Sequence, residues 1–116
     1  MTLDELRAEI DVLDLKLVEL ISERARAVVK IGQLKAVVAA PVYEPDRERR
    51  IFANLRAANQ GPLPDNELLH IYERIIDVMR ALQKNELASE KNARAAAGQG
   101  TGPGANPEAT EIGKSK

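Results

Sequence analysis

The chain has 116 residues, enough for one domain or for one small domain with a tail. Its 17 Lys and Arg residues nearly balance its 18 Asp and Glu residues, so the net charge of -1 gives no reason to expect a nucleic acid or an anionic membrane as partner. The absence of cysteine excludes disulfides and a thiol nucleophile, and the single histidine, His70, argues against a Ser-His-Asp triad or a multi-histidine metal site.

The N-terminal sequence MTLDELRAEI is charged and lacks the apolar region of a signal peptide. No apolar run approaches the ~20 residues that a membrane span needs. We therefore expect a soluble, cytoplasmic protein with no membrane partner.

The first predicted element is a long helix over residues 3–39. Thr2 and Glu5 have the spacing of a capping box, in which the hydroxyl and the carboxylate each bond to an end amide. At 1.5 Å per residue this helix would be about 55 Å long. Apolar residues follow at alternating spacings of three and four, the period of a helix with a packed seam: Leu3, Leu6, Ile10, Leu13, Leu17, Leu20, Val28, Ile31 and Val38.

A helix of this length cannot be covered by the rest of its own chain. A compact domain of about 87 residues has a radius of gyration of only about 12 Å, so the seam would contact water unless a second copy covered it. We therefore expect a homodimer in which the long helices pack along each other. The alternative is a break near Gly32 that folds the helix back within a monomer.

Two further helices are predicted, which makes the chain all-α in the order long, short, long. After a loop with prolines at each end, Asp46 is a suitable N-cap for a helix that ends near Ala58. The sequence GPLP at residues 61–64 then precedes a third helix with Pro64 in its first turn. The three-four spacing recurs in that helix at Leu68, Ile71, Ile75, Val78 and Leu82.

Composition changes sharply near residue 88. Residues 88–116 contain one large aliphatic side chain, Ile112, and cannot bury enough apolar surface to offset the entropy of ordering them. We predict a folded domain over residues 1–87 and a disordered, low-complexity tail over residues 88–116, with at most a frayed helical extension through 93–97. A linker to a partner is the alternative role for this segment.

Charged and polar residues interrupt the apolar faces of the helices. Arg24 and Lys35 lie on one stripe of the long helix with two aliphatic residues between them. An unpaired buried cation is costly, so these side chains either reach solvent, pair with Glu19 or Glu23, or bind an anionic ligand. Gln83 adds a neutral amide at the edge of the stripe on the third helix.

Two further groups of charges could complete an anion site. Residues 44–48 bring charges of both signs to a helix start, where backbone amides can also receive an anion. Arg7 lies about 25 Å from Arg24 along the helix axis, too far for one small ligand within one chain. In an antiparallel dimer, Arg7 of one chain could approach Arg24 and Lys35 of the other. The plain alternative is that these side chains are solvated or pair with nearby acids.

A set of motifs extends over residues 3 to about 85. It consists of LR..ID..D..L..L...R over residues 6–24, I...K over residues 31–35, the pair Arg47-Glu48 and the late Gln83. Together these motifs resemble the all-helical chorismate mutase family. The resemblance implies an intertwined helical homodimer with two equivalent active sites, each using one arginine from the neighbouring chain.

The resemblance also implies a role for each matching cation and for the glutamine. Arg7 is similar to the arginine that crosses to the neighbouring site, and Arg24 to the one that holds a substrate carboxylate within its own chain. Lys35 matches the lysine that bonds a carboxylate and the ether oxygen of the substrate. Gln83 matches the glutamine on the other side of that oxygen.

The start of the second predicted helix is also similar to the family. Arg47 and Glu48 match a pair in which the glutamate meets the substrate hydroxyl. Glu44 stands where the family often has an aspartate near the same hydroxyl, a change that keeps the carboxylate but lengthens its reach. Met79 departs from the family, in which a small hydroxyl residue is common, so a hydrogen bond to substrate from this position is not expected.

The reaction implied by this resemblance is the Claisen rearrangement of chorismate to prephenate in phenylalanine and tyrosine biosynthesis, which makes the chain an isomerase. This unimolecular step needs no nucleophile, metal or cofactor, only a cationic clamp that holds the dianion in its reactive conformer. Negative charge grows on the ether oxygen in the transition state, where a preorganised donor such as Lys35 or Gln83 can contribute roughly 3 kcal/mol.

Two alternatives remain open on the residues alone. An isochorismate-pyruvate lyase would share the fold and the clamp and also runs a pericyclic reaction. A non-catalytic helical dimerisation module would share only the fold. The sequence also leaves room for control by a partner enzyme of the same pathway.

Overall fold

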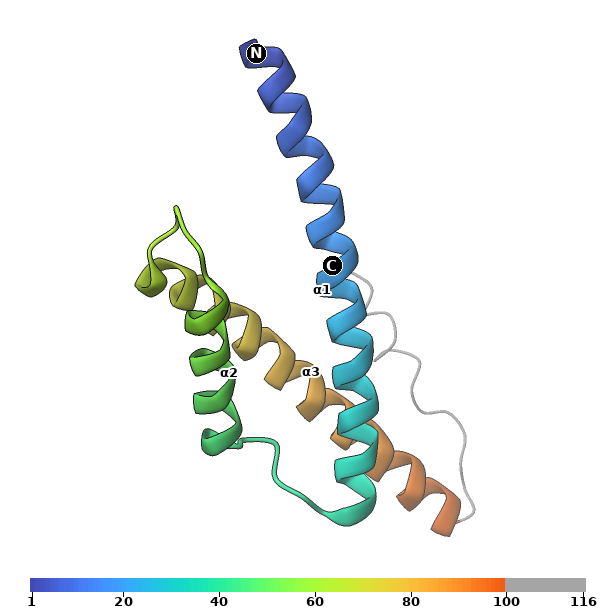
Figure 1. Ribbon diagram of the computed structural model, residues 1–116. Helices are drawn as coiled ribbons and strands as arrows, with labels where there is room; N and C mark the ends of the chain where they lie inside the picture. The colour runs from blue at the N-terminus through green and yellow to red at the C-terminus, as the bar shows by residue number, and fades with distance from the viewer. Residues whose placement is uncertain (100–116) are drawn as a thin grey trace.

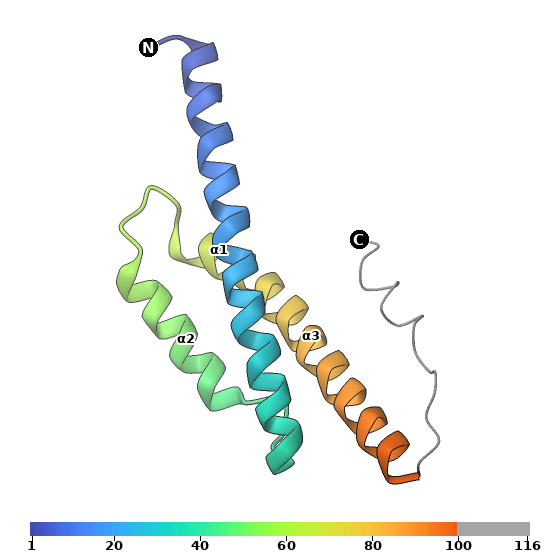
Figure 2. The same ribbon diagram turned by 90° about the vertical axis from the view of Figure 1, so that its right-hand side faces the viewer.

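Three helices and two connections make up the part of the chain that the structure describes. The computed structural model describes residues 1–99, with helices α1 (Leu3–Val38), α2 (Pro45–Ala58) and α3 (Asp65–Gln99). Figures 1 and 2 show α1 and α3 crossing each other, with α2 beside them and the N-terminal half of α1 projecting beyond the other two helices. No strand occurs in residues 1–99, and the predicted all-α order of long, short and long helices is confirmed.

Helix α1 begins at the predicted capping box. The amide of Thr2 donates to Oε1 of Glu5 at 2.9 Å, and the amide of Glu5 donates to Oγ1 of Thr2 at 3.1 Å. The helix continues without interruption through Gly32, so the alternative of a break at this position is wrong. Gly32 is instead buried where α1 crosses α3: a Cβ at this position would lie 3.0 Å from Cβ of Glu86 and 3.4 Å from the carbonyl oxygen of Gln83. The glycine therefore permits the close approach of the two helices.

Helix α1 ends in a left-handed residue that is not glycine. Ala39 has φ 58° and ψ 37°, and its amide donates to the carbonyl oxygen of Lys35. The amide of Ala40 donates to the same oxygen at 3.0 Å. A side chain with a Cβ is disfavoured in this conformation, which glycine adopts freely.

We expect Ala39→Gly to raise the free energy of unfolding by about 0.5 kcal/mol, because relief of the left-handed alanine exceeds the added entropy of the unfolded chain. Urea denaturation followed by circular dichroism measures this change. Ala40→Gly is the matched control, since Ala40 does not have a positive φ and should lose stability on the same substitution. A less stable Ala39→Gly protein would contradict this expectation.

Prolines set the starts of α2 and α3 in a way that differs from the prediction. The N-cap of α2 is Glu44 and its first residue is Pro45, so the expectation that Asp46 caps this helix is wrong. Proline suits the first helical position because it has no amide to satisfy and its φ is already helical. Pro64 precedes α3 instead of lying within its first turn, and its carbonyl oxygen accepts from the amides of Glu67 and Leu68 at 3.1 and 3.0 Å.

Helix α3 extends past the predicted end of the folded domain. It runs to Gln99 and so includes the helical extension through residues 93–97 that the sequence allowed, while the division into a folded domain and a tail stays a prediction. The physical reason is composition: alanine, glutamate, lysine and arginine have high intrinsic helix propensity even without an apolar face to bury. Residues 100–116 of the predicted tail lie outside the described residues.

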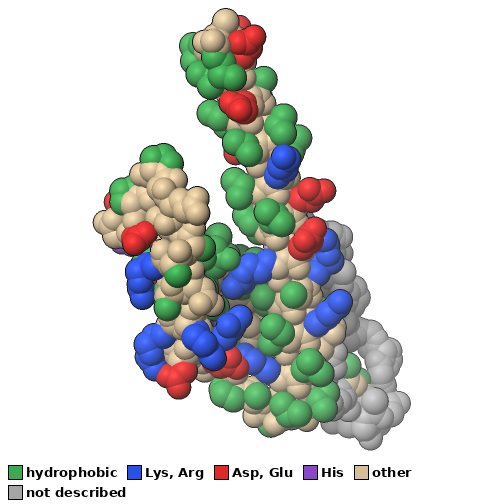
Figure 3. Space-filling view, viewed as in Figure 1, with side chains coloured by type: hydrophobic (Ala, Val, Ile, Leu, Met, Phe, Trp, Pro, Cys, Tyr) green, Lys and Arg blue, Asp and Glu red, His purple; other side chains and the backbone are tan. Residues whose placement is uncertain are grey.

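The hydrophobic core of a single copy is small. Among the residues whose burial the structure describes, the buried apolar ones are Val28, Ile76 and Met79. The radius of gyration is 18.7 Å, whereas a compact domain of this length would have about 13 Å. Every residue from 3 to 20 on α1 is exposed, and Figure 3 shows apolar side chains along this projecting part. None of the helices within residues 1–99 has a stretch long and apolar enough to cross a bilayer. The apolar side chains exposed on the projecting part of α1 form a stripe, called here the exposed stripe, that consists of Leu3, Leu6, Ile10, Leu13, Leu17 and Leu20.

Candidate active site

A pocket lies where the C-terminal half of α1, the start of α2 and the middle of α3 meet. Its volume of about 240 Å³ accommodates one small organic molecule, since a water molecule takes about 30 Å³ in the liquid. The buried core residues Val28, Ile76 and Met79 form part of its lining. Six of the seven predicted site residues also line it: Arg24, Lys35, Glu44, Arg47, Glu48 and Gln83.

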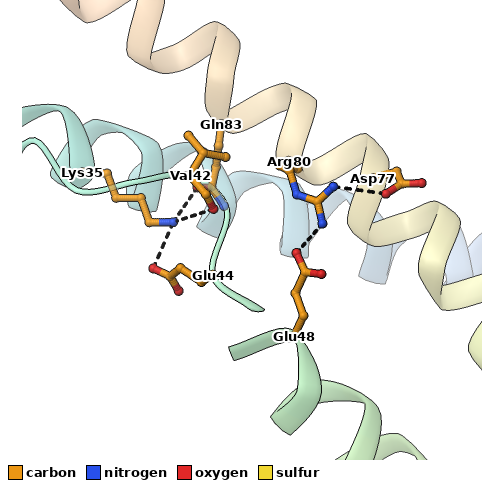
Figure 4. A network of polar contacts seen from close by, with 7 residues as sticks. All are labelled: Lys35, Val42, Glu44, Glu48, Asp77, Arg80 and Gln83. Carbon is orange, nitrogen blue, oxygen red and sulfur yellow. Dashed lines mark hydrogen bonds and ion pairs between the residues drawn. The ribbon is translucent and has the colours of Figure 1, made fainter. Parts of the chain in front are cut away.

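Lys35 occupies the centre of a hydrogen-bond network although only 8% of it is exposed. Its Nζ donates to the carbonyl oxygen of Val42 at 3.2 Å and to Oε1 of Gln83 at 2.9 Å, and it forms an ion pair with Oε2 of Glu44 at 3.1 Å (Figure 4). An ammonium group carries three protons, so three acceptors offset the cost of burying it. The acid beside Lys35 is therefore Glu44, and neither Glu19 nor Glu23 of its own helix.

The contact with Lys35 fixes the orientation of the Gln83 amide. Because an ammonium group has no acceptor, the amide must turn its oxygen toward Lys35. Its Nε2 donor has no protein partner within the described residues. Lys35 thus leaves Gln83 with a donor to offer to an acceptor in the pocket.

The two predicted arginines of the pocket come from different helices. Arg24 of α1 is half-buried, and its guanidinium carbon lies 5.5 Å from the centre of the Tyr72 ring on α3. A cation above an aromatic face is held by the ring quadrupole without losing its charge. Among the described side chains no acid lies within ion-pair distance of Arg24, so the alternative of pairing with Glu19 or Glu23 is not realised. Arg47 is exposed in the first turn of α2.

Arg80 also lines the pocket and was not predicted from the sequence. Its Nη2 donates to Oε2 of Glu48, its Nη1 donates to Oδ1 of Asp77 at 3.3 Å, and its guanidinium carbon lies 5.1 Å from the centre of the Tyr43 ring. The hydrogen bond to Glu48 raises the pKa of Arg80, against the opposing effect of burial. Its position one turn before Gln83 on α3 was the signal that could have identified it.

Arg7 does not line the pocket. It is exposed on the projecting half of α1, at the opposite end of the helix from Lys35. Within one chain it therefore remains outside the group of charges that the other predicted residues form. Its approach to the pocket of a second copy stays a prediction.

The charges of the pocket suit a small dianion. Arg24, Lys35, Arg47 and Arg80 contribute four positive charges, and Glu44 and Glu48 contribute two negative ones, for a net charge of +2. Figure 3 shows basic side chains gathered on α2 and between α2 and α1. The buried apolar floor lowers the effective dielectric constant, which strengthens attraction to an anion.

Comparison with known proteins identifies the family. Residues 6–84 match the family chorismate mutase type II. The chain is 38% identical over 86 residues to the bifunctional chorismate mutase/prephenate dehydratase of Aquifex aeolicus, covering 71% of this chain but 24% of that protein. It is 30% identical over 91 residues to the chorismate mutase of Methanocaldococcus jannaschii, covering 78% of this chain and 92% of that protein. The chain thus spans about a quarter of the bifunctional relatives and nearly all of a shorter one.

Solved structures agree with the sequence relatives. Chorismate mutase (form II) from Thermus thermophilus matches with a TM-score of 0.69 and 34% identity over 70% of this chain and 92% of that one. Chorismate mutase from Helicobacter pylori in complex with prephenate matches with a TM-score of 0.68 and 34% identity over 74% of this chain and 93% of that one. The family match covers more than half of the chain. The chain belongs to the chorismate mutase type II family.

Proposed function

We propose that this chain is a chorismate mutase, which converts chorismate to prephenate by an intramolecular Claisen rearrangement. The observation that carries the proposal is the 2.9 Å contact between Lys35 and Gln83 inside a pocket of net charge +2. Two donors side by side can face one ether oxygen, while the remaining cations bind the two carboxylates. The relative of known structure in complex with prephenate supports the same ligand class.

In the proposed mechanism, the protein accelerates the reaction mainly by binding and orienting the substrate. Arg24 and Arg47 hold the carboxylates, so the flexible dianion is held in the compact conformer in which the reacting carbons lie close together. One C–O bond breaks while one C–C bond forms, with no proton transfer and no covalent intermediate. Lys35 and the Nε2 donor of Gln83 stabilise the charge that develops on the ether oxygen, so they act on the transition state more than on the substrate.

Substrate must compete with the protein for Lys35. All three protons of the ammonium group face protein acceptors. A carboxylate or ether oxygen of the substrate therefore has to replace one of these acceptors. Glu44 is the acceptor that can leave, because its side chain is 43% exposed and sits at the N-cap of α2. In the proposed complex Glu44 turns toward the substrate hydroxyl, which Glu48 also meets.

A second copy of the chain completes the proposed site. The exposed apolar stripe of α1 and the extended shape of one copy support a homodimer in which the long helices cover each other. Arg7 lies on that projecting half, so the same contact would carry it toward the partner's pocket. The bifunctional relatives join a chorismate mutase to a prephenate dehydratase in one chain, which supports a partner enzyme of the same pathway.

The proposal is tested by the decay of chorismate absorbance with purified protein present at far less than one equivalent. We expect multiple turnovers with prephenate as the product. Isochorismate, assayed in parallel, should yield no pyruvate. Failure to deplete chorismate, together with no rise in melting temperature when prephenate is added, would reject the assignment and favour a non-catalytic helical module.

A further inference from the structure

Helix α2 is the least firmly held element of the site. It contributes Arg47 and Glu48 to the pocket, yet none of its residues is buried. With so little apolar packing, the position of its N-terminal turn depends on polar contacts to the neighbouring elements. The side chain of Glu48, which is 21% exposed, reaches across to α3 and makes such a contact with Arg80.

The guanidinium group of Arg80 joins three parts of the pocket wall. It donates to Glu48 of α2 and to Asp77 on its own helix (Figure 4). It also lies beside the ring of Tyr43. Tyr43 lies between Val42 and Glu44, which both contact the ammonium group of Lys35. One arginine on α3 therefore contacts both the start of α2 and the loop that surrounds Lys35.

The same arginine offsets a charge that would otherwise oppose binding. A carboxylate in a pocket for a dianion repels the ligand unless a cation faces it. Glu44 faces Lys35, and Glu48 faces Arg80. Glu48 can then accept a hydrogen bond from a hydroxyl group while its charge is directed toward α3.

We propose that Arg80 is a positioning residue that acts through Glu48, by holding its carboxylate against α3 with its charge offset so that a hydroxylated dianion can enter the pocket. This inference rests on the proposed function. Glu48 would contact the substrate hydroxyl, which takes no part in the bond changes. Arg80 should therefore stabilise the bound substrate and the transition state equally.

The kinetic consequence separates Arg80 from Lys35 and Gln83. Arg80→Met should raise KM for chorismate about tenfold and leave kcat within about twofold of the wild type, as expected for loss of uniform binding at a partly exposed ion pair. Arg80→Lys keeps the charge but cannot reach Glu48 and Asp77 together, so it should recover part of the loss. Arg74→Met, at an exposed position on the same helix, is the matched control and should leave both constants unchanged.

The decisive experiment is a double-mutant cycle. Glu48→Gln removes the charge that Arg80 offsets, so adding Arg80→Met to this variant should change KM by less than about twofold. Circular dichroism and melting curves establish that each variant is folded before its kinetics are compared.

Two outcomes would overturn the inference. An unchanged KM in Arg80→Met, with only a lower melting temperature, would assign Arg80 a purely structural role. An equal rise in KM with and without Glu48→Gln would show that Arg80 acts on the substrate directly and not through Glu48. Wild-type turnover of chorismate reports on the proposed function, and the variant ratios report on Arg80, so the two failures are distinguishable.

Discussion

Lys35→Ala is expected to lower kcat for chorismate by about 10³-fold, the upper range for loss of one preorganised donor. The ammonium group is buried and in contact with Gln83, so no other described cation can take its place beside the ether oxygen. The substitution also frees the Gln83 amide to rotate, because the contact that directs its oxygen is lost. Initial rates of chorismate loss over a range of substrate concentrations measure kcat separately from KM.

The matched control is Lys30→Ala, which removes the same group from an exposed position on the same helix. It should leave kcat unchanged. Lys35→Ala also leaves Glu44 without its ion-pair partner, so melting curves should accompany the kinetics. A fall in kcat of less than about fivefold in a folded Lys35→Ala protein would contradict the proposed stabilisation of the ether oxygen.

Mixing Arg7→Ala chains with Lys35→Ala chains should restore activity that neither has alone. If Arg7 serves the pocket of the partner, one site of the mixed dimer contains both lesions and the other contains none. With random pairing, half of the dimers are mixed, so about a quarter of all sites are intact and about a quarter of wild-type activity should return. The measurement is the chorismate rate after subunit exchange, with exchange verified by differently tagged chains.

A second mixture controls for this result. Arg24 and Lys35 line the pocket of one and the same chain. Every site in a mixed dimer of Arg24→Ala and Lys35→Ala chains therefore carries one lesion, and no activity should return. Recovery in both mixtures, or in neither after verified exchange, would contradict the shared pocket.

Sequence periodicity predicted the helices well because each apolar stripe depends only on local spacing. The capping box at Thr2 was predictable for the same reason, since its partners are three residues apart. The start of α2 was less predictable: Asp46 is a good capping residue, but Pro45 directly before it is even better suited to the first helical turn. The helical extension past residue 88 was expected only as a frayed end because this segment has few apolar residues to bury, but its alanine, glutamate, lysine and arginine residues favour a helix through intrinsic propensity.

The residues that form the site could be predicted from the sequence, but the contacts between their side chains could not. Periodicity places Lys35 and Gln83 on inward faces of two helices, yet it cannot state that their side chains meet. The partner of Lys35 turned out to be Glu44 in a loop, a contact that depends on how the chain turns after α1. Arg80 was overlooked because an arginine between apolar residues of a helix is usually solvated, and its acid partner lies on another helix.

The crossing at Gly32 has a consequence for attempts to redesign this pocket. Lys35 lies one turn further along α1, and the carbonyl oxygen of Gln83 is among the atoms nearest to the missing side chain of Gly32. The absence of a side chain at position 32 thus sets the distance between α1 and α3, and with it the distance between Lys35 and Gln83. Even a methyl group at this position would push against α3. Mutant libraries that vary substrate preference should keep Gly32 constant, because a greater distance between the helices would lower the activity of every variant regardless of its new contacts.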